Sequence, residues 1–277
     1  MGRFCYTRYV DIKTFQKTVW DYYAANKRAM SWREKITPYR VFVSEVMLQQ
    51  TQVARVREKF PQFIKLFPTF NSLAAAPLTD VLSAWQGMGY NRRALYLKKA
   101  ADVIMRDHGG RLPRNPIELE KLAGIGPATA RSIAAFAWNS PEVFIEANVR
   151  AVFLHHFCAG RPGVSDSQLL PFVEKALDIK NPREWYYALM DYGVMLKRAH
   201  TNPSRASAHH AKQSKFEGSM RETRGKIVKL LAGGAQSYTE TALIQHTMEP
   251  ILKVRTALTS LIHDGLIKKD NNIFRIV

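Results

Sequence analysis

The sequence predicts an all-α protein whose last fifteen residues add a β-hairpin. Apolar residues recur at helical spacing along most of the chain, and short turns marked by Gly or Pro separate these segments. No alternating apolar and polar pattern, the signal of a half-buried strand, competes with this spacing before the C-terminal end. With 277 residues, 46% of them apolar, the chain can form one large domain or two smaller ones with real cores.

The predicted helices follow one another through the first 198 residues. Apolar side chains at helical spacing indicate the first helix within residues 10–26. Thr37 is a candidate N-cap with Pro38 at the first helical position, and we expect this helix to run to about Arg57. Further helices are expected at residues 69–76, 78–86, 91–107, 116–122, 127–138, 148–157, 166–177 and 182–198.

The C-terminal segment has a plan of its own. After three helices, two short apolar stretches flank Asp270-Asn271-Asn272, a sequence that favours a hairpin turn. Three helices followed by a β-hairpin indicate a winged-helix-like domain at residues 219–277. The expected helices are 220–231, 239–246 and 250–264, and the expected hairpin arms are 266–269 and 273–276.

Charge and cysteine content narrow the class of partner and compartment. Forty-one Lys and Arg against 23 Asp and Glu give +18, which favours a polyanionic partner. These charges are interleaved with aromatic residues, which favours a folded nucleic-acid binder over a basic tail or a membrane-surface protein. No apolar run reaches the roughly 20 residues of a membrane span, and no signal-peptide core is evident. We expect a cytoplasmic, nucleoid-associated protein without a membrane partner, and Cys5 and Cys158 fit a reducing compartment.

Residues 122–138 read as a helix, a tight turn and a second helix. The turn is Gly124-Ile125-Gly126-Pro127, and Pro127 suits the first position of the helix that follows. A helix N-terminus offers unpaired N–H groups and a positive dipole end, which favour a phosphate, and glycine admits a close backbone approach. Small residues in the second helix let the two helices pack closely, so we expect a helix–hairpin–helix motif.

The helix expected from Pro38 carries one polar stripe on an apolar background. Glu45, Gln49 and Gln52 fall at i, i+4 and i+7. A carboxylate on such a helix is costly unless it is exposed, paired or used. The stripe either faces water or faces a cleft, where burial would raise the pKa of Glu45 and let it deliver a proton near neutral pH.

Five motifs occur in an order that resembles one protein family. They are SEVMLQQTQV (44–53), LSAWQGMGYNRRA (82–94), HGGRLP (108–113), LAGIGPATA (122–130) and IEANVRAV (145–152). The string, over residues 30–198, resembles MutY-type adenine DNA glycosylases of the helix–hairpin–helix superfamily that includes endonuclease III. The resemblance implies two helical subdomains with the active-site cleft between them, and hydrolysis of an N-glycosidic bond after base flipping.

The resemblance also implies roles for individual residues. Glu45 would be the general acid, and Glu146 with Asn148 would stabilise the oxocarbenium-like sugar. The residues expected to enter the base stack or recognise the lesion are Gln49, Gln50, Tyr90 and Trp32. Those expected to contact DNA phosphates are Gly124, Ile125, Gly126, Ala128, Thr129, Arg92 and Arg93. A monovalent cation bound by the backbone carbonyls of Leu122 and Ile125 is the one metal site implied.

The chain departs from the family at four places. Glu146 stands where the family has Asp, so it either replaces that residue or only caps a helix. Ala128 stands where a bifunctional enzyme has its Schiff-base lysine, so no lyase activity is expected. The four-cysteine iron–sulfur loop is replaced by a Ser- and His-rich basic connector, residues 201–218, and we expect no iron–sulfur cluster and no metal on its histidines. The module that reads 8-oxoguanine is replaced by the winged helix.

We therefore expect a monomeric, monofunctional glycosylase acting on a mispaired or damaged base in double-stranded DNA, with adenine first. Thymine or uracil opposite guanine and hypoxanthine stay open as substrates. A catalytically silent mismatch or lesion binder and a winged-helix regulator on a glycosylase scaffold are the alternatives. The expected division is residues 1–29 with 137–200, residues 30–136 with the hairpin, the connector 201–218 and the winged helix 219–277.

Overall fold

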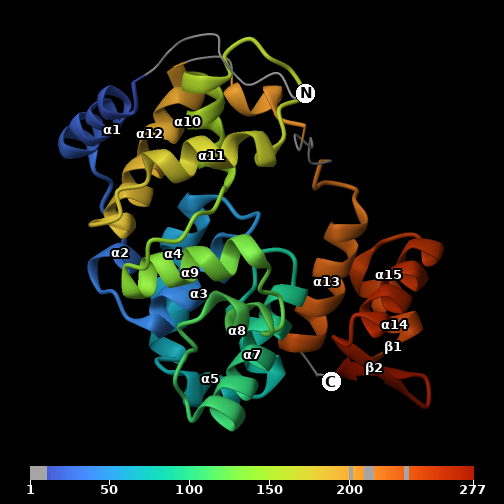
Figure 1. Cartoon of the computed structure of the whole chain (residues 1–277). Helices are drawn as coiled ribbons and strands as arrows, with labels where there is room; N and C mark the ends of the chain where they lie inside the picture. Colours follow the sequence, from blue (N-terminus) through green and yellow to red (C-terminus); the bar gives the residue numbers. More distant parts are fainter. Residues whose placement is uncertain (1–10, 200–201, 209–214, 234–236) are drawn as a thin grey trace. The chain divides into compact units, whose positions relative to one another are not determined.

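The computed structural model describes residues 11–199, 202–208, 215–233 and 237–277, which are mostly helical (Figure 1). These residues form two compact units. Unit 1 comprises the described residues within 1–41, 114–117 and 126–212, and unit 2 those within 42–113, 118–125 and 213–277. The predicted division into four segments stays a prediction. None of the described helices is long and apolar enough to cross a membrane.

Unit 1 is built around α12, which packs against α1, α9 and α10. Phe15 of α1 lies in an aromatic core and contacts Phe153, Phe157 and Trp185 edge-on. A Cβ at Gly193 would come within 2.7 Å of the Asn148 carbonyl oxygen, so glycine is needed where α12 meets α10. The elements are α1 (Ile12–Asn26), α2 (Ser31–Glu34), α9 (Pro127–Trp138), α10 (Ala147–Phe157), α11 (Asp166–Ala176), α12 (Pro182–Ala199) and η1 (Pro203–Ala206).

A buried carboxylate ties the start of the chain to α12. Asp191 is 1% exposed and accepts from Arg28 at 2.7 Å and from Arg33 at 3.0 Å. The backbone N–H of Arg28 also donates to this carboxylate, at 3.0 Å. Removing one partner of a buried pair leaves an uncompensated charge, so these contacts fix the path from α1 to α2.

Unit 2 places α7 against α5 and α6 over a second aromatic core. Phe60, Phe63 and Trp85 are fully buried there, and Phe63 and Trp85 contact edge-on at 5.8 Å. The helices of this part of unit 2 are α3 (Pro38–Leu48), α4 (Val53–Leu66), α5 (Phe70–Ala75), α6 (Leu78–Ala84), α7 (Arg92–His108) and α8 (Pro116–Glu120). The first residues of α3 and α8 belong to unit 1.

The prediction of one helix from Pro38 to about Arg57 is wrong. The helix ends at Leu48, and a second helix, α4, begins at Val53. Gln50 between them has a φ of 54°, in the left-handed region that ends a right-handed helix. Gln49 and Gln52 therefore do not extend a stripe from Glu45 along a single helix.

The C-terminal module of unit 2 has the topology of a winged helix, as predicted (orange to red in Figure 1). Strand β3 lies between β1 and β2 and pairs antiparallel with both. Asn271 and Asn272 have φ of 42° and 67°, as a two-residue hairpin turn requires. Strand β1 was not expected. The elements are α13 (Met220–Gly233), β1 (Ser237–Thr239), α14 (Glu240–Thr247), α15 (Ile251–His263), β2 (Ile267–Asp270) and β3 (Ile273–Ile276).

Candidate active site

A buried arginine holds together three segments that the sequence associates with the site. Arg93, near the start of α7, is 9% exposed, and burial lowers its pKa to about 10, so it remains charged at neutral pH. Its two terminal nitrogens donate to five acceptors from the end of α3, the turn after it and the turn before α7. The acceptors, at 2.8 to 3.1 Å, are the carbonyl oxygens of Val46, Met47, Met88 and Gly89 and the Thr51 hydroxyl.

The expectation that Arg93 contacts a DNA phosphate is therefore wrong. The two terminal nitrogens already donate to five protein acceptors, and Nε, which has no partner, is buried, so no N–H group of Arg93 faces a phosphate at the surface. Arg92 beside it is half-exposed and forms an ion pair with Asp264 of the C-terminal module, at 2.6 Å. A phosphate contact by Arg92 would compete with that ion pair.

Glu45 lies on α3, directly before Val46 and Met47, the two residues of this helix whose carbonyls Arg93 binds. Its neighbours Ser44, Val46 and Met47 are buried, whereas Glu45 itself is partly exposed. The carboxylate is therefore carried by a core helix but remains accessible to solvent. Both environments predicted for Glu45, water and a cleft, stay predictions.

The turn after α3 reaches the glycine hairpin. Gln49 donates from Nε2 to the carbonyl oxygen of Gly124 at 3.2 Å. Gly124 has a φ of 78°, and a Cβ there would come within 2.9 Å of the Tyr96 ring, so glycine is required on two grounds. Gln50 next to Gln49 is exposed. Gln49 and Gln50 therefore sit on a turn anchored to the hairpin.

Gly126 is the N-cap residue of α9, and the space around it is open. It is exposed, and a Cβ built on it would meet no atom within 4 Å. Pro127 and Ala128 in the first turn of α9 are also exposed, whereas Thr129 is partly buried. A phosphate can therefore approach this twelve-residue helix at its N-terminus, where N–H groups lack partners within the helix.

The predicted cation carbonyls lie at the other side of this turn. The side chains of Leu122 and Ile125 are buried, and the Leu122 carbonyl accepts from the Ile125 N–H at 3.2 Å. A carbonyl oxygen has two lone pairs, so this hydrogen bond leaves one for a cation. Cation binding by Leu122 and Ile125 stays a prediction.

Tyr90 is presented by a turn with three left-handed residues. Gly87, Gly89 and Tyr90 have φ of 85°, 69° and 49°. Left-handed backbone is uncommon for a residue with a side chain, and strain of this kind clusters at functional sites. The Tyr90 ring is 37% exposed. Trp32, in contrast, is 4% exposed and buried, which favours packing over base stacking.

Glu146 caps the N-terminus of α10 with its side chain. Its Oε1 accepts from the backbone N–H groups of Asn148 at 2.8 Å and Val149 at 2.9 Å. Its Oε2 accepts from Asn148 Nδ2 at 3.2 Å. Glu146 therefore caps α10, while the choice between a cap alone and a catalytic carboxylate stays open. The same three hydrogen bonds fix the direction of a partly exposed carboxylate, so capping does not prevent a catalytic role.

Lys197 was not predicted as a site residue, yet it lies next to this cap. Its ammonium donates to Asn148 Oδ1 at 3.0 Å. Burial lowers the pKa of Lys197, while the nearby Glu146 charge raises it in part. Asn148 therefore bridges a carboxylate and an amine. Sequence position, near the end of a long helix, gives no signal of this contact.

A family model for HhH-GPD superfamily base excision DNA repair proteins matches residues 43–215, which is more than half of the chain. The chain belongs to this superfamily. Within it, the chain is 30% identical over 274 residues to an adenine DNA glycosylase of Mycobacterium tuberculosis, covering 90% of this chain and 88% of the relative. It is 31% identical over 184 residues to an adenine DNA glycosylase of Buchnera aphidicola. That match covers 66% of this chain and about half (52%) of the relative. The chain is thus a member of the adenine DNA glycosylase branch.

Solved structures agree with the superfamily fold. A thermostable thymine-DNA glycosylase has a TM-score of 0.60 at 24% identity, covering 66% of this chain and 86% of the other. An endonuclease III–DNA complex has a TM-score of 0.54 at 18% identity, covering 76% and 92%. At these identities the likeness establishes the fold of this HhH-GPD member and nothing about its substrate.

The donor set of this HhH-GPD protein does not fit a four-cysteine iron–sulfur cluster. The chain has two cysteines, and Cys158 is buried and forms no disulfide. Within the described ranges, no three His, Cys, Asp or Glu side chains are grouped as metal ligands. The predictions for His200, His209 and His210 lie outside the described residues, so the expected absence of a metal there stays a prediction.

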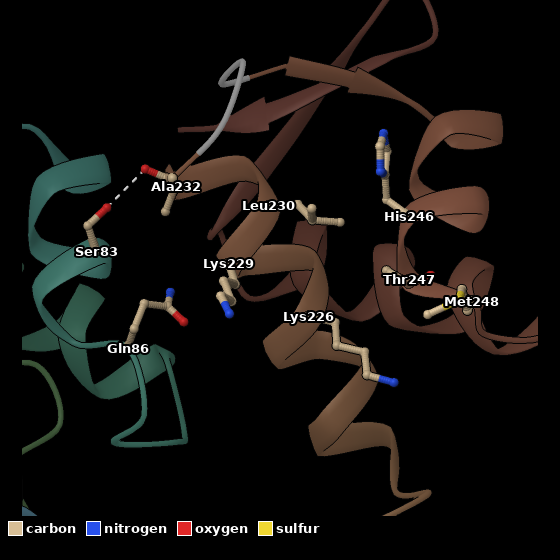
Figure 2. Close-up of a pocket in the computed structure, with 10 residues that line it drawn as sticks. Ser83, Gln86, Lys226, Lys229, Leu230, Ala232, His246, Thr247 and Met248 are labelled. Carbon is tan, nitrogen blue, oxygen red and sulfur yellow. Dashed lines mark hydrogen bonds between the residues drawn. The ribbon is translucent and has the colours of Figure 1, made fainter.

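A hollow of about 570 Å³ lies between α6, α13 and α14 of unit 2. Figure 2 shows Ser83 and Gln86 at the left, Lys226 and Lys229 on α13 in the middle and His246 on α14 at the right. None of the predicted site residues lines it. It is therefore separate from the residues assigned to catalysis, although Ser83 and Gln86 precede the Tyr90 turn in sequence.

His156 provides a test of packing on α10. Its ring stacks with Tyr192 at 5.6 Å and meets Phe15 edge-on at 5.1 Å, and burial lowers its pKa to about 4. The ordinary value in an unfolded chain is about 6.5. The unfolded state therefore binds more protons between pH 6.5 and 4, and stability should fall as the pH falls through this window.

When the pH is lowered from 7 to 5, the free energy of unfolding should fall in wild type by about 2 kcal/mol because of His156. The His156→Gln variant should lack this part of the decrease. Urea unfolding at both pH values measures this difference. The matched control His263→Gln removes an exposed ring and should keep the wild-type pH dependence. Equal pH dependence of wild type and His156→Gln would contradict this assignment.

Proposed function

We propose that this protein is a monofunctional DNA N-glycosylase that removes adenine from mispaired double-stranded DNA by hydrolysis. The observation that carries the proposal is the 30% identity that extends over 88% of the Mycobacterium tuberculosis adenine DNA glycosylase. The exposed N-terminus of α9 and the net charge of +18 support DNA as the partner. A monomeric state and a cytoplasmic, nucleoid-associated location are proposed on composition.

Glu45 is the proposed general acid. Protonation of a ring nitrogen of the flipped adenine lets the electrons of the N-glycosidic bond leave with the base. Water then adds to the sugar carbon and gives up a proton, so that free adenine and an abasic site are the products. The partial exposure of Glu45 on an otherwise buried helix turn suits this role.

Glu146 and Asn148 are proposed to face the sugar. The bond breaks with positive charge developing on the sugar ring, and an oriented carboxylate stabilises that charge. The three hydrogen bonds to Glu146 supply the orientation before substrate arrives. Because the longer glutamate side chain folds back onto the helix end, its carboxylate occupies a position set by the cap.

The hairpin is proposed to hold a phosphate of the strand that contains the flipped base. Gly126, Ala128 and the backbone at Thr129 form its open end, and Gly124 and Ile125 shape the turn. Gln49, Gln50 and Tyr90 are proposed to occupy the space that the base vacates. The methyl side chain of Ala128 provides no amine, so we propose that the enzyme does not cleave the strand.

A panel of duplexes tests the function. Each duplex carries adenine, thymine, uracil or hypoxanthine in a defined pair, and hot alkali after incubation reveals abasic sites as strand breaks. The proposal expects breaks at adenine in a mispair and none without alkali. Tight mismatch binding without any product would instead support the catalytically silent binder, and product at another base alone would reassign the substrate.

Glu45→Gln should reduce single-turnover excision by at least about 100-fold, because the amide cannot deliver the proton. Mispair affinity, measured by fluorescence anisotropy, should change less than threefold. The control Glu58→Gln removes an exposed carboxylate from α4 and should excise at the wild-type rate. Full activity of Glu45→Gln would remove this residue from the mechanism.

Glu146 separates capping from catalysis through a pair of variants. Glu146→Asp keeps both the charge and a favoured N-cap residue, while Glu146→Ser keeps a cap without charge. We expect both variants to unfold within about 1 kcal/mol of wild type, and we expect the serine variant to lose at least tenfold in single-turnover rate. If Glu146→Ser excises as fast as wild type, the carboxylate serves the helix alone.

A further inference from the structure

We propose that Arg221 of α13 positions Tyr90, so that the winged helix takes part in choosing the base pair that is opened. The inference rests on the proposed function, because Tyr90 matters only where a base leaves the stack. Arg221 lies in the C-terminal module, outside the residues that carry the family resemblance, and would give that module a part in DNA recognition. Arg221 is a positioning residue in this scheme, acting through Tyr90.

The contact between the two side chains is direct. Arg221 Nη1 donates to the Tyr90 hydroxyl at 3.1 Å, and the guanidinium lies 5.7 Å from the centre of the Tyr90 ring. A guanidinium within about 6 Å of an aromatic ring is attracted to it, and the hydrogen bond adds directionality. The buried Arg93 also lies 5.7 Å from this ring. Two arginines therefore orient the Tyr90 ring: Arg93 of α7 and Arg221 of the C-terminal module.

The backbone that carries Tyr90 is held independently of this contact. Arg55 Nη1 donates to the carbonyl of Gly87 at 2.7 Å, and Trp85 Nε1 donates to that of Gly89 at 3.2 Å. Arg93 binds the carbonyls of Met88 and Gly89. With the backbone fixed, the Arg221 contact acts on the Tyr90 side chain.

An ion pair and a hydrogen bond hold the C-terminal module next to the Tyr90 turn, and this fixes the position of Arg221. Asp264, its side chain 4% exposed, pairs with Arg92 at 2.6 Å and with Arg224 at 2.5 Å. Burial alone would raise the pKa of Asp264, but the hydrogen bonds from Arg224 and Arg92 hold it below its usual value. A second tether joins Ser83 Oγ to the Ala232 carbonyl at 2.9 Å, drawn as a dashed line in Figure 2.

Arg92 and Tyr90 are two residues apart, and both contact the winged helix. The module thus meets the Tyr90 turn through residues of α13 and through the end of α15. An arginine that served only as a phosphate contact would need neither the hydroxyl of Tyr90 nor a fixed distance from its ring. The geometry therefore favours positioning of Tyr90 over nonspecific attraction of DNA.

A double-mutant cycle tests this directly. Arg221→Ala, Tyr90→Phe and the double variant are compared in single-turnover excision and in the ratio of Kd for a mispaired and a fully paired duplex. Tyr90→Phe keeps the ring and removes the hydroxyl. We expect each single variant to lower the discrimination ratio by roughly tenfold, and the double variant to be little worse than Arg221→Ala.

Two control variants separate positioning of Tyr90 from a general effect of charge. Arg255→Ala removes an exposed arginine of the same module, which pairs with Glu240 at 2.7 Å, and should keep the wild-type discrimination ratio. Arg221→Lys, which keeps the charge but lacks the planar fork, should fall between wild type and Arg221→Ala. Additive effects in the cycle would overturn the proposal. So would an equal loss of affinity for all duplexes with a shallower salt dependence, which marks a phosphate contact.

The binding ratio keeps this test apart from that of the proposed function. If wild type excises no base from any duplex, the proposed function fails, while non-additive loss of mispair discrimination would still support the role of Arg221. If wild type excises adenine and the cycle is additive, the function stands and the role of Arg221 is refuted. Thermal unfolding of each variant confirms that a loss of discrimination comes from a folded protein.

Discussion

The buried guanidinium of Arg93 is the interaction on which the rest of the site depends. One side chain satisfies carbonyls at the end of α3, a hydroxyl in the turn that follows and carbonyls in the turn before α7. These segments carry Glu45, Gln49 and Tyr90 respectively. A planar group with donors in fixed directions can hold three backbone segments in one geometry, which a flexible ammonium cannot. The proposed acid and the proposed stacking residue thus share one support.

The protein divides its proposed tasks between elements held in different ways. Hydrogen bonds from an arginine fix the turns of unit 2, whereas the helix cap at Glu146 fixes the second carboxylate in unit 1. The winged helix adds a third kind of support, a buried carboxylate that pairs with one arginine from each side. Each of these three supports fixes the position of a functional side chain by charged or directional hydrogen bonds, and each leaves that side chain partly exposed.

Much of this could be predicted from the sequence, and the failures have physical reasons. The helix at 127–138 begins and ends as expected because Pro127 and the small residues that follow leave few alternatives. The break after Leu48 was missed because Gln50 takes a left-handed conformation that its residue type does not signal. Strand β1 is three residues long and depends on pairing with β3, a long-range contact. Arg93 was misassigned because sequence does not distinguish a buried arginine from an exposed one, and the contacts of Lys197 and Arg221 arise from tertiary packing alone.

The single-turnover excision rate of Arg93→Lys tests the central claim most directly. Lysine keeps the charge but cannot reach five acceptors, and misplacement of catalytic groups by about 1 Å costs on the order of 100-fold in rate. We predict a loss of that size in a variant that is folded by circular dichroism, with duplex affinity changed less than threefold. Arg106→Lys, on the exposed side of the same helix, should excise at the wild-type rate. A folded Arg93→Lys protein with wild-type excision would contradict the account.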